Sequence, residues 1–214
     1  LAVFNLIKFK PIKYAWLVQK HDAVVAMITF ILTLLWAPHL EKSILVGVIL
    51  AMGLYMYRTM RPRIAVLSMR ADGNLGDAEV NNLETCPNIS MIRFDGPLFF
   101  ANTGYFEEKV LERVALKPGL KFIIIDAEGI NEIDATGEEM LHQLAVRLNG
   151  LGIEFLFCRT KKQVMDVFRR TGFAGNEWLN HFHRNEQEAI NFAWDRLENH
   201  NRDCCPLNKS SISS

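Results

Sequence analysis

The residues best suited to binding or chemistry lie in one stretch, residues 121–140. Residues 122–125 form a continuous apolar run of Phe and Ile, which predicts a strand buried on both faces. A polar loop then leads to the start of an amphipathic helix. In open α/β sheets, ligands bind where a strand passes through a loop to a helix N-terminus. The candidate contact or ligand residues are Asp126, Asn131, Asp134 and Gly137, with Asn102 from an earlier segment, and the candidate regulatory residue is Thr136.

The hydroxyl of Thr136 has two interpretations. Thr136-Gly137-Glu138-Glu139 has the spacing of a capping box, in which the threonine accepts from the third helical amide and Glu139 reaches back. Such a cap contributes about 1 kcal/mol. Alternatively, Thr136 is a phosphorylation site, where a phosphate would gain from the helix dipole but would face Asp134, Glu138 and Glu139. Capping is the favoured interpretation, and phosphorylation stays open.

Patterns of catalytic residues are absent from the sequence. There is no Gly-rich phosphate loop, Ser-His-Asp order or metal-ligand spacing. Asp126 at a strand end resembles a phospho-accepting aspartate, but a receiver domain would also need an acidic pair where Ser68-Met69-Arg70 stands. The histidines are scattered, and His181 and His183 are predicted to lie in a surface loop. We therefore expect no enzyme, no catalytic residue, no metal and no cofactor.

The cysteines are Cys86, Cys158, Cys204 and Cys205. They show no Cys-x-x-Cys spacing, which predicts a reducing compartment and no metal site. Cys158 ends an apolar run and is predicted to be a buried thiol. The Cys204-Cys205 pair is either a lipidation site or part of a disordered tail.

Charge is divided unevenly along the chain. Residues 1–63 hold eight Lys or Arg and two Asp or Glu, whereas residues 64–214 hold sixteen and twenty-two. A basic, apolar front and an acidic rear suggest two environments. Nucleic-acid binding is not expected, because the basic residues flank apolar runs and form no patch.

Two apolar runs without a charge, residues 23–37 and 43–57, predict membrane helices. Each would span about 22 Å as a helix, short of the roughly 30 Å hydrocarbon core, so buried core helices or a re-entrant hairpin are the alternatives. Neither run has a polar face, which favours membrane embedding. Basic residues flank the pair on both outer sides, and this bias predicts that the region after Arg63 is cytoplasmic.

The remainder alternates between strand and helix patterns. Arg61-Pro62 is predicted to end the second apolar helix. Strands are predicted over residues 64–69, 89–94, 98–100, 122–125 and 153–158, and helices over 103–116, 137–149, 161–170 and 186–199. Residues 70–88 are predicted to be a loop. This order indicates an α/β domain whose mixed sheet has helices mainly on one face.

Four segments together carry a resemblance to the C-terminal part of bacterial sulfate permease (SulP) family anion transporters, with their STAS domain. They are Asp22-Ala23-Val24-Val25 with Thr29-Phe30 and Thr33-Leu34, Gly47-Val48, Tyr57-Arg58 with Arg61-Pro62, and the pair formed by residues 96–102 (GPLFFAN) and 134–137 (DATG). The resemblance covers nearly all of residues 20–198. It implies a membrane-embedded helical part over residues 1–62, a STAS domain over 63–199 and a disordered tail over 200–214.

The resemblance also implies secondary transport of an anion such as sulfate, bicarbonate or a dicarboxylate. It places the protein in the inner (plasma) membrane as a multi-pass homodimer with a cytoplasmic STAS domain. The implied partners are the lipid membrane, the missing transporter core helices, and a cytoplasmic regulatory protein or a nucleotide near Asp126, Asn131 and Thr136.

One departure from the family leaves an alternative open. Transporters of this family need a dozen or more membrane segments, and their anion site lies between two broken helices upstream of the region present here. A complete chain of this kind could not form the family's substrate pathway alone, whereas a fragment would hold the regulatory end and not the transport site. The alternative is a membrane-tethered partner-switching module related to anti-sigma factor antagonists, in which the residue matching Thr136 is a serine that a kinase phosphorylates.

Overall fold

The computed structural model describes residues 14, 16–175, 178–197 and 205–207. The chain divides into two compact units, Leu1–Met60 and Arg61–Ser214, which we describe one at a time.

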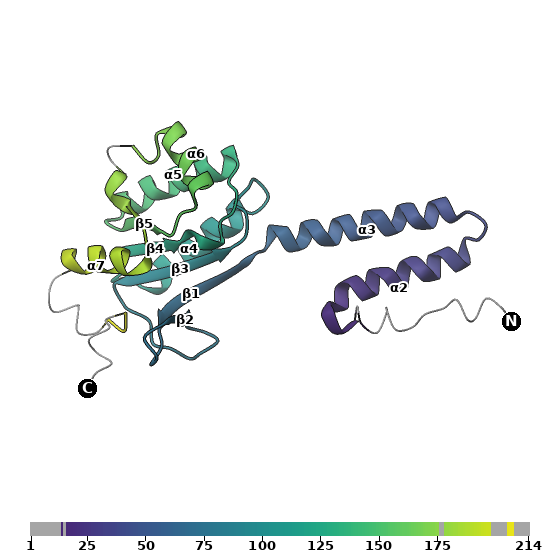
Figure 1. Cartoon of the computed structure of the whole chain (residues 1–214), viewed down its shortest axis with the longest axis horizontal. Coiled ribbons are helices and arrows are strands. Elements are labelled where there is room, and N and C mark those ends of the chain that lie inside the picture. Colours follow the sequence, from purple (N-terminus) through teal and green to yellow (C-terminus); the bar gives the residue numbers. More distant parts are fainter. Residues whose placement is uncertain (1–13, 15, 176–177, 198–204, 208–214) are drawn as a thin grey trace. The chain divides into compact units, whose positions relative to one another are not determined.

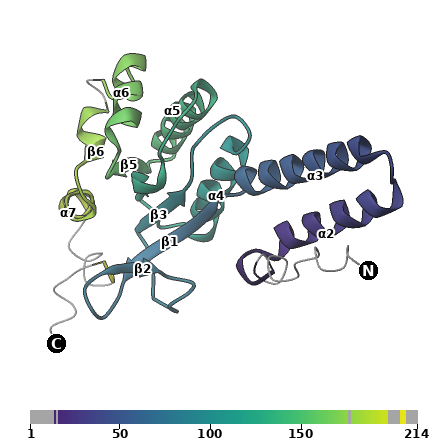
Figure 2. The ribbon, with the colours of Figure 1, turned by 45° about the vertical axis from the view of Figure 1, so that its right-hand side comes forward.

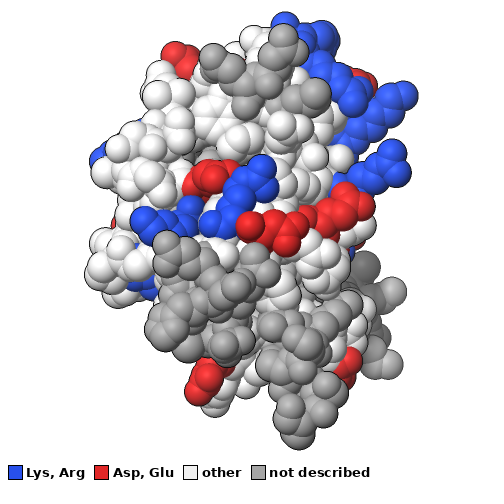
Figure 3. Space-filling view, turned by 90° about the vertical axis from the view of Figure 1, so that its left-hand side faces the viewer, with Lys and Arg blue, Asp and Glu red and all other residues white. Residues whose placement is uncertain are grey.

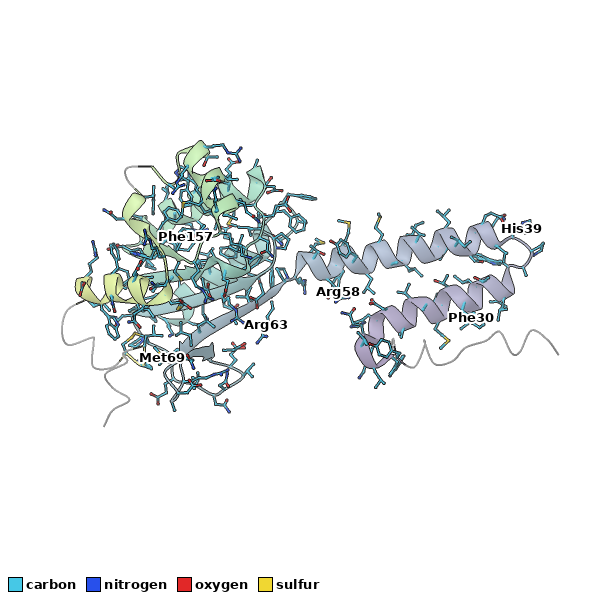
Figure 4. The ribbon with its side chains drawn as sticks, in the orientation of Figure 1. Phe30, His39, Arg58, Arg63, Met69 and Phe157 are labelled. Carbon is cyan, nitrogen blue, oxygen red and sulfur yellow. A yellow bond between two sulfur atoms is a disulfide. The ribbon has the colours of Figure 1, made fainter. Side chains whose placement is uncertain are left out.

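The first unit contains a helical hairpin, made of α2 (Lys20–Leu35) and α3 (Leu40–Met60), whose connection includes His39 (Figures 1, 2 and 4). Small and hydroxyl side chains let the helices approach each other. The Ser43 hydroxyl donates to the Leu32 carbonyl at 3.1 Å, and a Cβ on Gly47 would lie 2.7 Å from the Thr29 side chain. Close approach at small residues is typical of helix pairs in membranes.

Away from the charged residues near the helix ends, the outer surface of the hairpin is apolar. Among the described residues of the two helices, only Ala23 and Ser43 are buried, and large side chains such as Phe30, Leu34, Leu45 and Ile49 are exposed. α3 has 21 residues and is about 32 Å long, matching the hydrocarbon core better than the 15-residue run in the sequence. Within the described part of the chain, α3 is the one helix long and apolar enough to cross a membrane.

The second unit is built on a six-stranded mixed sheet with the order β2-β1-β3-β4-β5-β6 (Figure 1). β1 pairs antiparallel with β2 and β3, and the strands from β3 to β6 are parallel. The strands are β1 (Arg63–Met69), β2 (Leu75–Asp77), β3 (Ile89–Asp95), β4 (Phe122–Asp126), β5 (Glu154–Cys158) and β6 (Phe182–His183). The mixed α/β fold expected from the sequence is confirmed.

The sheet is covered on both faces, more heavily on one. Three helices pack on the first face: α4 (Thr103–Leu116), α5 (Ala135–Gly150) and α6 (Lys162–Thr171). Their core includes Phe94, Phe106 and Phe157, and Figure 4 shows Phe157 inside this unit. On the second face, α7 (Glu186–Arg196) covers a smaller core that includes Met91 and Ile124. Alternate residues of each strand point to opposite faces of the sheet. Because both faces are covered, β4 is buried along its whole length.

Some short elements differ from the sequence prediction. β2 and β6 were not predicted, because three and two residues are too few to show an alternating pattern. Residues 98–100 form no strand, and Leu98 makes a single bridge to Ile133. His183 lies in β6 instead of a surface loop, and burial lowers its pKa. α7 ends at Arg196, while residues 198 and 199 of the predicted helix lie outside the described residues.

A disulfide joins Cys86 to Cys205, 119 residues apart. Both cysteines are buried, and so is the neighbouring Leu207, all three in the core on the α7 side. The sequence analysis did not pair these two cysteines, and the predicted disordered tail is wrong for residues 205–207. The bridge occupies Cys205, while Cys204 lies outside the described residues. Cys158 is a buried thiol as predicted, and burial raises its pKa.

Gly129 provides a test of the packing beside β3. It ends a 3₁₀ turn over Ala127–Gly129, and a Cβ there would lie 2.1 Å from the Phe94 carbonyl oxygen. We expect Gly129→Ala to lower the free energy of unfolding by about 3 kcal/mol, since backbone cannot move aside easily. Gly104→Ala is the matched control, because it lies within α4 with open space around it and should be stabilising by up to about 1 kcal/mol. Equal urea midpoints for the two variants would contradict this account.

Candidate functional site

Two segments distant in sequence, residues 96–102 and 130–137, are joined by hydrogen bonds. The Leu98 amide donates to the Glu132 carbonyl at 2.9 Å, and the Asp134 amide donates to the Leu98 carbonyl at 3.2 Å. The Asp134 carboxylate accepts from the Phe100 amide at 2.9 Å and from the Gly137 amide at 2.7 Å. The structure thus brings together the two segments that the sequence marked as a pair.

Asp134 is the N-cap of α5, and the predicted capping role of Thr136 is wrong. Thr136 is the second residue of the helix, and its exposed hydroxyl makes no hydrogen bond among the described residues. Glu139 accepts from Gln143 at 3.2 Å instead of reaching back. Asp134 caps the helix in place of Thr136 because its carboxylate accepts from the Gly137 amide and also from the Phe100 amide. The four-residue sequence motif gives no sign of the contact with Phe100.

Asn102 and Gly137 hold this loop pair in place. The buried Asn102 side chain donates to the Pro97 carbonyl at 2.8 Å and accepts from the Phe99 amide at 3.0 Å, which closes the turn between them. A Cβ on Gly137 would lie 2.7 Å from the Leu98 carbonyl oxygen, so the first turn of α5 can approach Leu98 only with glycine there. Asn102 and Gly137 therefore determine the conformation of the two joined segments.

The outward side of the loop pair carries an aromatic ring and a hydroxyl. Phe100 is 64% exposed and meets Phe99 edge to face, with ring centroids 5.5 Å apart. Asp134 links Phe100 to the first turn of α5, where Thr136 is exposed. We call Phe100, Asp134 and Thr136 the Phe100–Thr136 surface. Phe100 and Thr136 are thus exposed residues on the two segments that Asp134 joins.

Asp126, in contrast, is fully buried and serves as an ion-pair anchor. Arg159 donates to both of its carboxylate oxygens, at 3.1 and 3.0 Å, and the Glu128 amide donates to it at 3.2 Å. The same guanidinium contacts Glu128 and lies 2.8 Å from Glu186 at the start of α7. This cluster joins β4, the turn after β5 and α7, which leaves Asp126 no open side for a ligand.

Asn131 lies on yet another side of the loop. Its side-chain oxygen accepts from the Lys161 ammonium, and its carbonyl accepts from Gln163. It lines a shallow hollow of 430 Å³ between this loop and α6. The candidate residues therefore do not converge on one pocket: Asn102, Asp134 and Gly137 share one contact zone, while Asp126 and Asn131 are separate. In the described ranges, no group of three His, Cys, Asp or Glu residues is placed to hold a metal ion.

Arg159 is the functional neighbour that the sequence reasoning missed. It lies 33 residues after Asp126, so no local pattern links the two. The register of the parallel pair β4–β5 places Asp126 opposite Cys158, the residue before Arg159. The sequence did contain one indication of this pair: two predicted neighbouring strands end at Asp126 and just before Arg159, so parallel pairing would bring an acid and a base together.

The ion pair predicts a large difference between two neighbouring acids. Asp126→Asn should lower the free energy of unfolding by about 3 kcal/mol, because it leaves Arg159 without its buried partner. Glu128→Gln is the control, since the Glu128 side chain is 58% exposed and should contribute under about 1 kcal/mol. Urea unfolding followed by circular dichroism measures both, and a loss at Glu128 equal to that at Asp126 would refute the anchor.

Comparison with known proteins identifies the domain. The STAS domain model matches residues 81–189. The chain is 27% identical over 198 residues to the probable sulfate transporter 4.2 of Arabidopsis thaliana, covering 83% of this chain and 28% of that protein. It is 23% identical over 229 residues to a sulfate transporter of Ovis aries, covering 89% of this chain and 31% of that protein. The chain thus spans less than a third of these relatives.

A solved structure agrees in fold over both parts of the chain. The murine Slc26a9 anion transporter, in an inward-facing state, superposes with a TM-score of 0.75 at 20% identity, covering 86% of this chain and 30% of that one. The curated relatives carry the names of transporters and not of enzymes. With its STAS model match and its sulfate-transporter relatives, this chain belongs to the STAS domain family as it occurs in sulfate and anion transporters.

Proposed function

We propose that this chain is the last membrane segment and the regulatory STAS domain of a secondary anion transporter. One observation carries the proposal: the match to sulfate transporters covers 83% of the chain, more than the STAS domain alone could account for. Sulfate is the first substrate to test, because the relatives carry that name, and bicarbonate and dicarboxylates are anions of the same class.

The hairpin supports a place in the membrane. Its helices expose large apolar side chains on all sides, so they need lipid or further helices around them. The Arg58 side chain near the end of α3 contacts Gln19 and lies 3.7 Å from Asp22, which gathers polar groups at that end of the hairpin. Lys and Arg residues also flank the two apolar runs on their outer sides. Together these features support a multi-pass plasma-membrane protein in which both outer ends of the hairpin, and the STAS domain, lie on the cytoplasmic side.

The Phe100–Thr136 surface supports a regulatory contact. Phe100 offers an apolar anchor, and the loop behind it is fixed by Asn102 and Asp134, so a partner would meet a preformed shape. A bulky or charged change at this surface would therefore alter regulation without unfolding the domain.

A second candidate, a partner-switching module switched at Thr136, rests on one specific observation. Since Asp134 caps α5, the Thr136 hydroxyl is free and exposed, and its modification would leave the cap intact. The helix N-terminus would favour a phosphate, while the nearby carboxylates of Asp134 and Glu139 would oppose it. If purified chain incubated with cell extract and ATP carries no phosphate on Thr136 by mass spectrometry, this candidate is eliminated.

Transport is tested with the complete reading frame. We expect the DNA upstream of Leu1 to encode ten or more apolar segments in the same frame. Cells that lack their own sulfate uptake should then accumulate labelled sulfate when they express that frame, and bicarbonate or a dicarboxylate should replace sulfate if it is the true substrate. Correctly inserted protein that moves none of these anions would overturn the transporter proposal.

Regulation is tested at Thr136 within the same frame. Thr136→Glu should change the uptake rate at least about fivefold, because it adds charge to the contact surface, and Thr136→Ser should leave the rate unchanged. Gln143→Glu is the matched control, since it makes a similar charge change at another exposed position of α5. An equal response to both glutamate substitutions would mean that charge anywhere on α5 matters and that Thr136 has no special role.

A further inference from the structure

A disulfide ties the end of the described chain to the second face of the sheet. Cys86 lies shortly before β3, and its partner Cys205 follows α7 along the chain. Cys205 and Leu207 are both buried, with exposed fractions of 2% and 1%. In Figures 1 and 2 this yellow segment lies near β2 and apart from α7. We call residues 205–207 the C-terminal strap.

The C-terminal strap and α7 cover different parts of the second face. α7 packs mainly on β4, β5 and β6. The core on this face extends further, to residues of β1 and β3 that it shares with both bridged cysteines and Leu207; they are Ala65, Leu67, Ile89 and Met91. Because Cys86 leads into β3 and is bonded to Cys205, the strap completes the cover over the β1–β3 part of this face.

The segment around Cys86 is held by contacts other than the disulfide. The Lys117 ammonium donates to the Thr85 hydroxyl at 2.8 Å and to the Cys86 carbonyl at 2.5 Å. The Ser68 hydroxyl of β1 donates to the Glu84 carbonyl. This segment therefore keeps its place when the bond to Cys205 is broken.

The C-terminal strap has fewer attachments. No hydrogen bond joins residues 205–207 to another described residue, so within the described chain the strap is held by the disulfide and by the burial of Leu207. α7 has attachments of its own, since Asn185 caps it and Glu186 lies 2.8 Å from Arg159. Figure 3 shows acidic and basic side chains next to one another on the side of the molecule that carries α7. Loss of the disulfide would therefore free the strap and leave α7 in place.

We propose that the C-terminal strap is a redox-controlled cover of β1 and β3, closed by the Cys86–Cys205 disulfide and released by a small monothiol such as glutathione. The thiolate of one glutathione attacks a sulfur of the bridge, the S–S bond breaks, a mixed disulfide forms, and the other cysteine takes up the proton that glutathione lost. A second glutathione displaces the first cysteine from the mixed disulfide. The products are two cysteine thiols and one oxidised glutathione, and oxidised glutathione closes the strap by the reverse steps.

Cys158 takes no part in this exchange. It is a buried thiol of the same core, and burial raises its pKa, so it supplies no thiolate to attack the bridge. The proposal concerns the STAS domain itself and does not depend on whether the complete protein transports anions.

The proposal couples the disulfide to the burial of Leu207. If reduction releases the C-terminal strap, Leu207 leaves the core only in the reduced chain. Truncation of Leu207 then weakens the oxidised state alone and makes the bridge easier to reduce. If the strap instead stayed in place after reduction, Leu207 would be buried in both states and its truncation would not change the equilibrium.

The test equilibrates the purified full chain in detergent with mixtures of reduced and oxidised glutathione. Alkylation of free thiols and mass spectrometry give the fraction that carries the bridge. Leu207→Ala should lower the value of [GSH]²/[GSSG] at half-reduction at least about tenfold, as expected for the loss of a buried leucine side chain. Leu151→Ala is the matched control, because Leu151 is 60% exposed, and it should leave that value unchanged. An unchanged value in Leu207→Ala would overturn the proposal.

A second measurement detects the uncovered face directly. Met91 belongs to the core beneath the strap, and Met69 alternates with Leu67 on the same face of β1. With methyl-labelled methionine, a soluble gadolinium chelate should broaden the NMR signal of Met69 or Met91 in the reduced chain and in Cys205→Ser, and not in the oxidised chain. The Met140 signal is the control, because Met140 packs against the core on the opposite face.

Two outcomes of this measurement would also overturn the proposal. Protection of both Met69 and Met91 in the reduced chain would mean that the strap stays closed. Equal broadening of the Met140 signal would mean that the whole domain loosens. Sulfate uptake by the complete reading frame is a separate measurement, so failure of one proposal leaves the other intact.

Discussion

The ion pair between Asp126 and Arg159 is the interaction on which the carboxyl edge of the sheet depends. Asp126 is fully buried, and a carboxylate in that position requires a paired charge with good geometry. Arg159 meets that need with two hydrogen bonds and extends to Glu128 and Glu186. One guanidinium thereby fixes the 3₁₀ turn after β4, the turn after β5 and the start of α7. Residues 130–137, which include Asp134 and Thr136, follow this anchor directly along the chain.

The loop pair around Asp134 shows how one side chain can define a surface. Its two carboxylate oxygens hold the Phe100 amide and the first turn of α5, so the two loops keep a fixed relation. Gly137 allows the close approach, and Asn102 closes the turn on the other side. Backbone atoms take part in most of these contacts, and the side chains of Phe100 and Thr136 stay exposed.

The hairpin and the α/β unit bury their apolar side chains by different means. In the α/β unit, both faces of the sheet are covered by helices of the same chain, and β4 is buried from end to end. In the hairpin, the two helices meet along small and hydroxyl residues, and most large side chains point outward. An apolar exterior without a polar face is stable in a membrane and not in water. The two units therefore differ in how their apolar side chains are covered, and this difference parallels the uneven division of charge along the sequence.

The sequence by itself determined the larger elements and the family. The apolar run of β4, the apolar helices and the periodic faces of α4 and α5 are local patterns, and such patterns survive because burial acts on each element separately. Tertiary structure decided the roles of the polar residues. Asp126 became an anchor because β5 brings Arg159 beside it, and Asp134 displaced Thr136 as the helix cap because Phe100 lies within reach. The Cys86–Cys205 disulfide also joins residues far apart in the chain. Hydrogen bonds and ion pairs depend on distances of a few ångströms between such residues, and only the folded chain sets those distances.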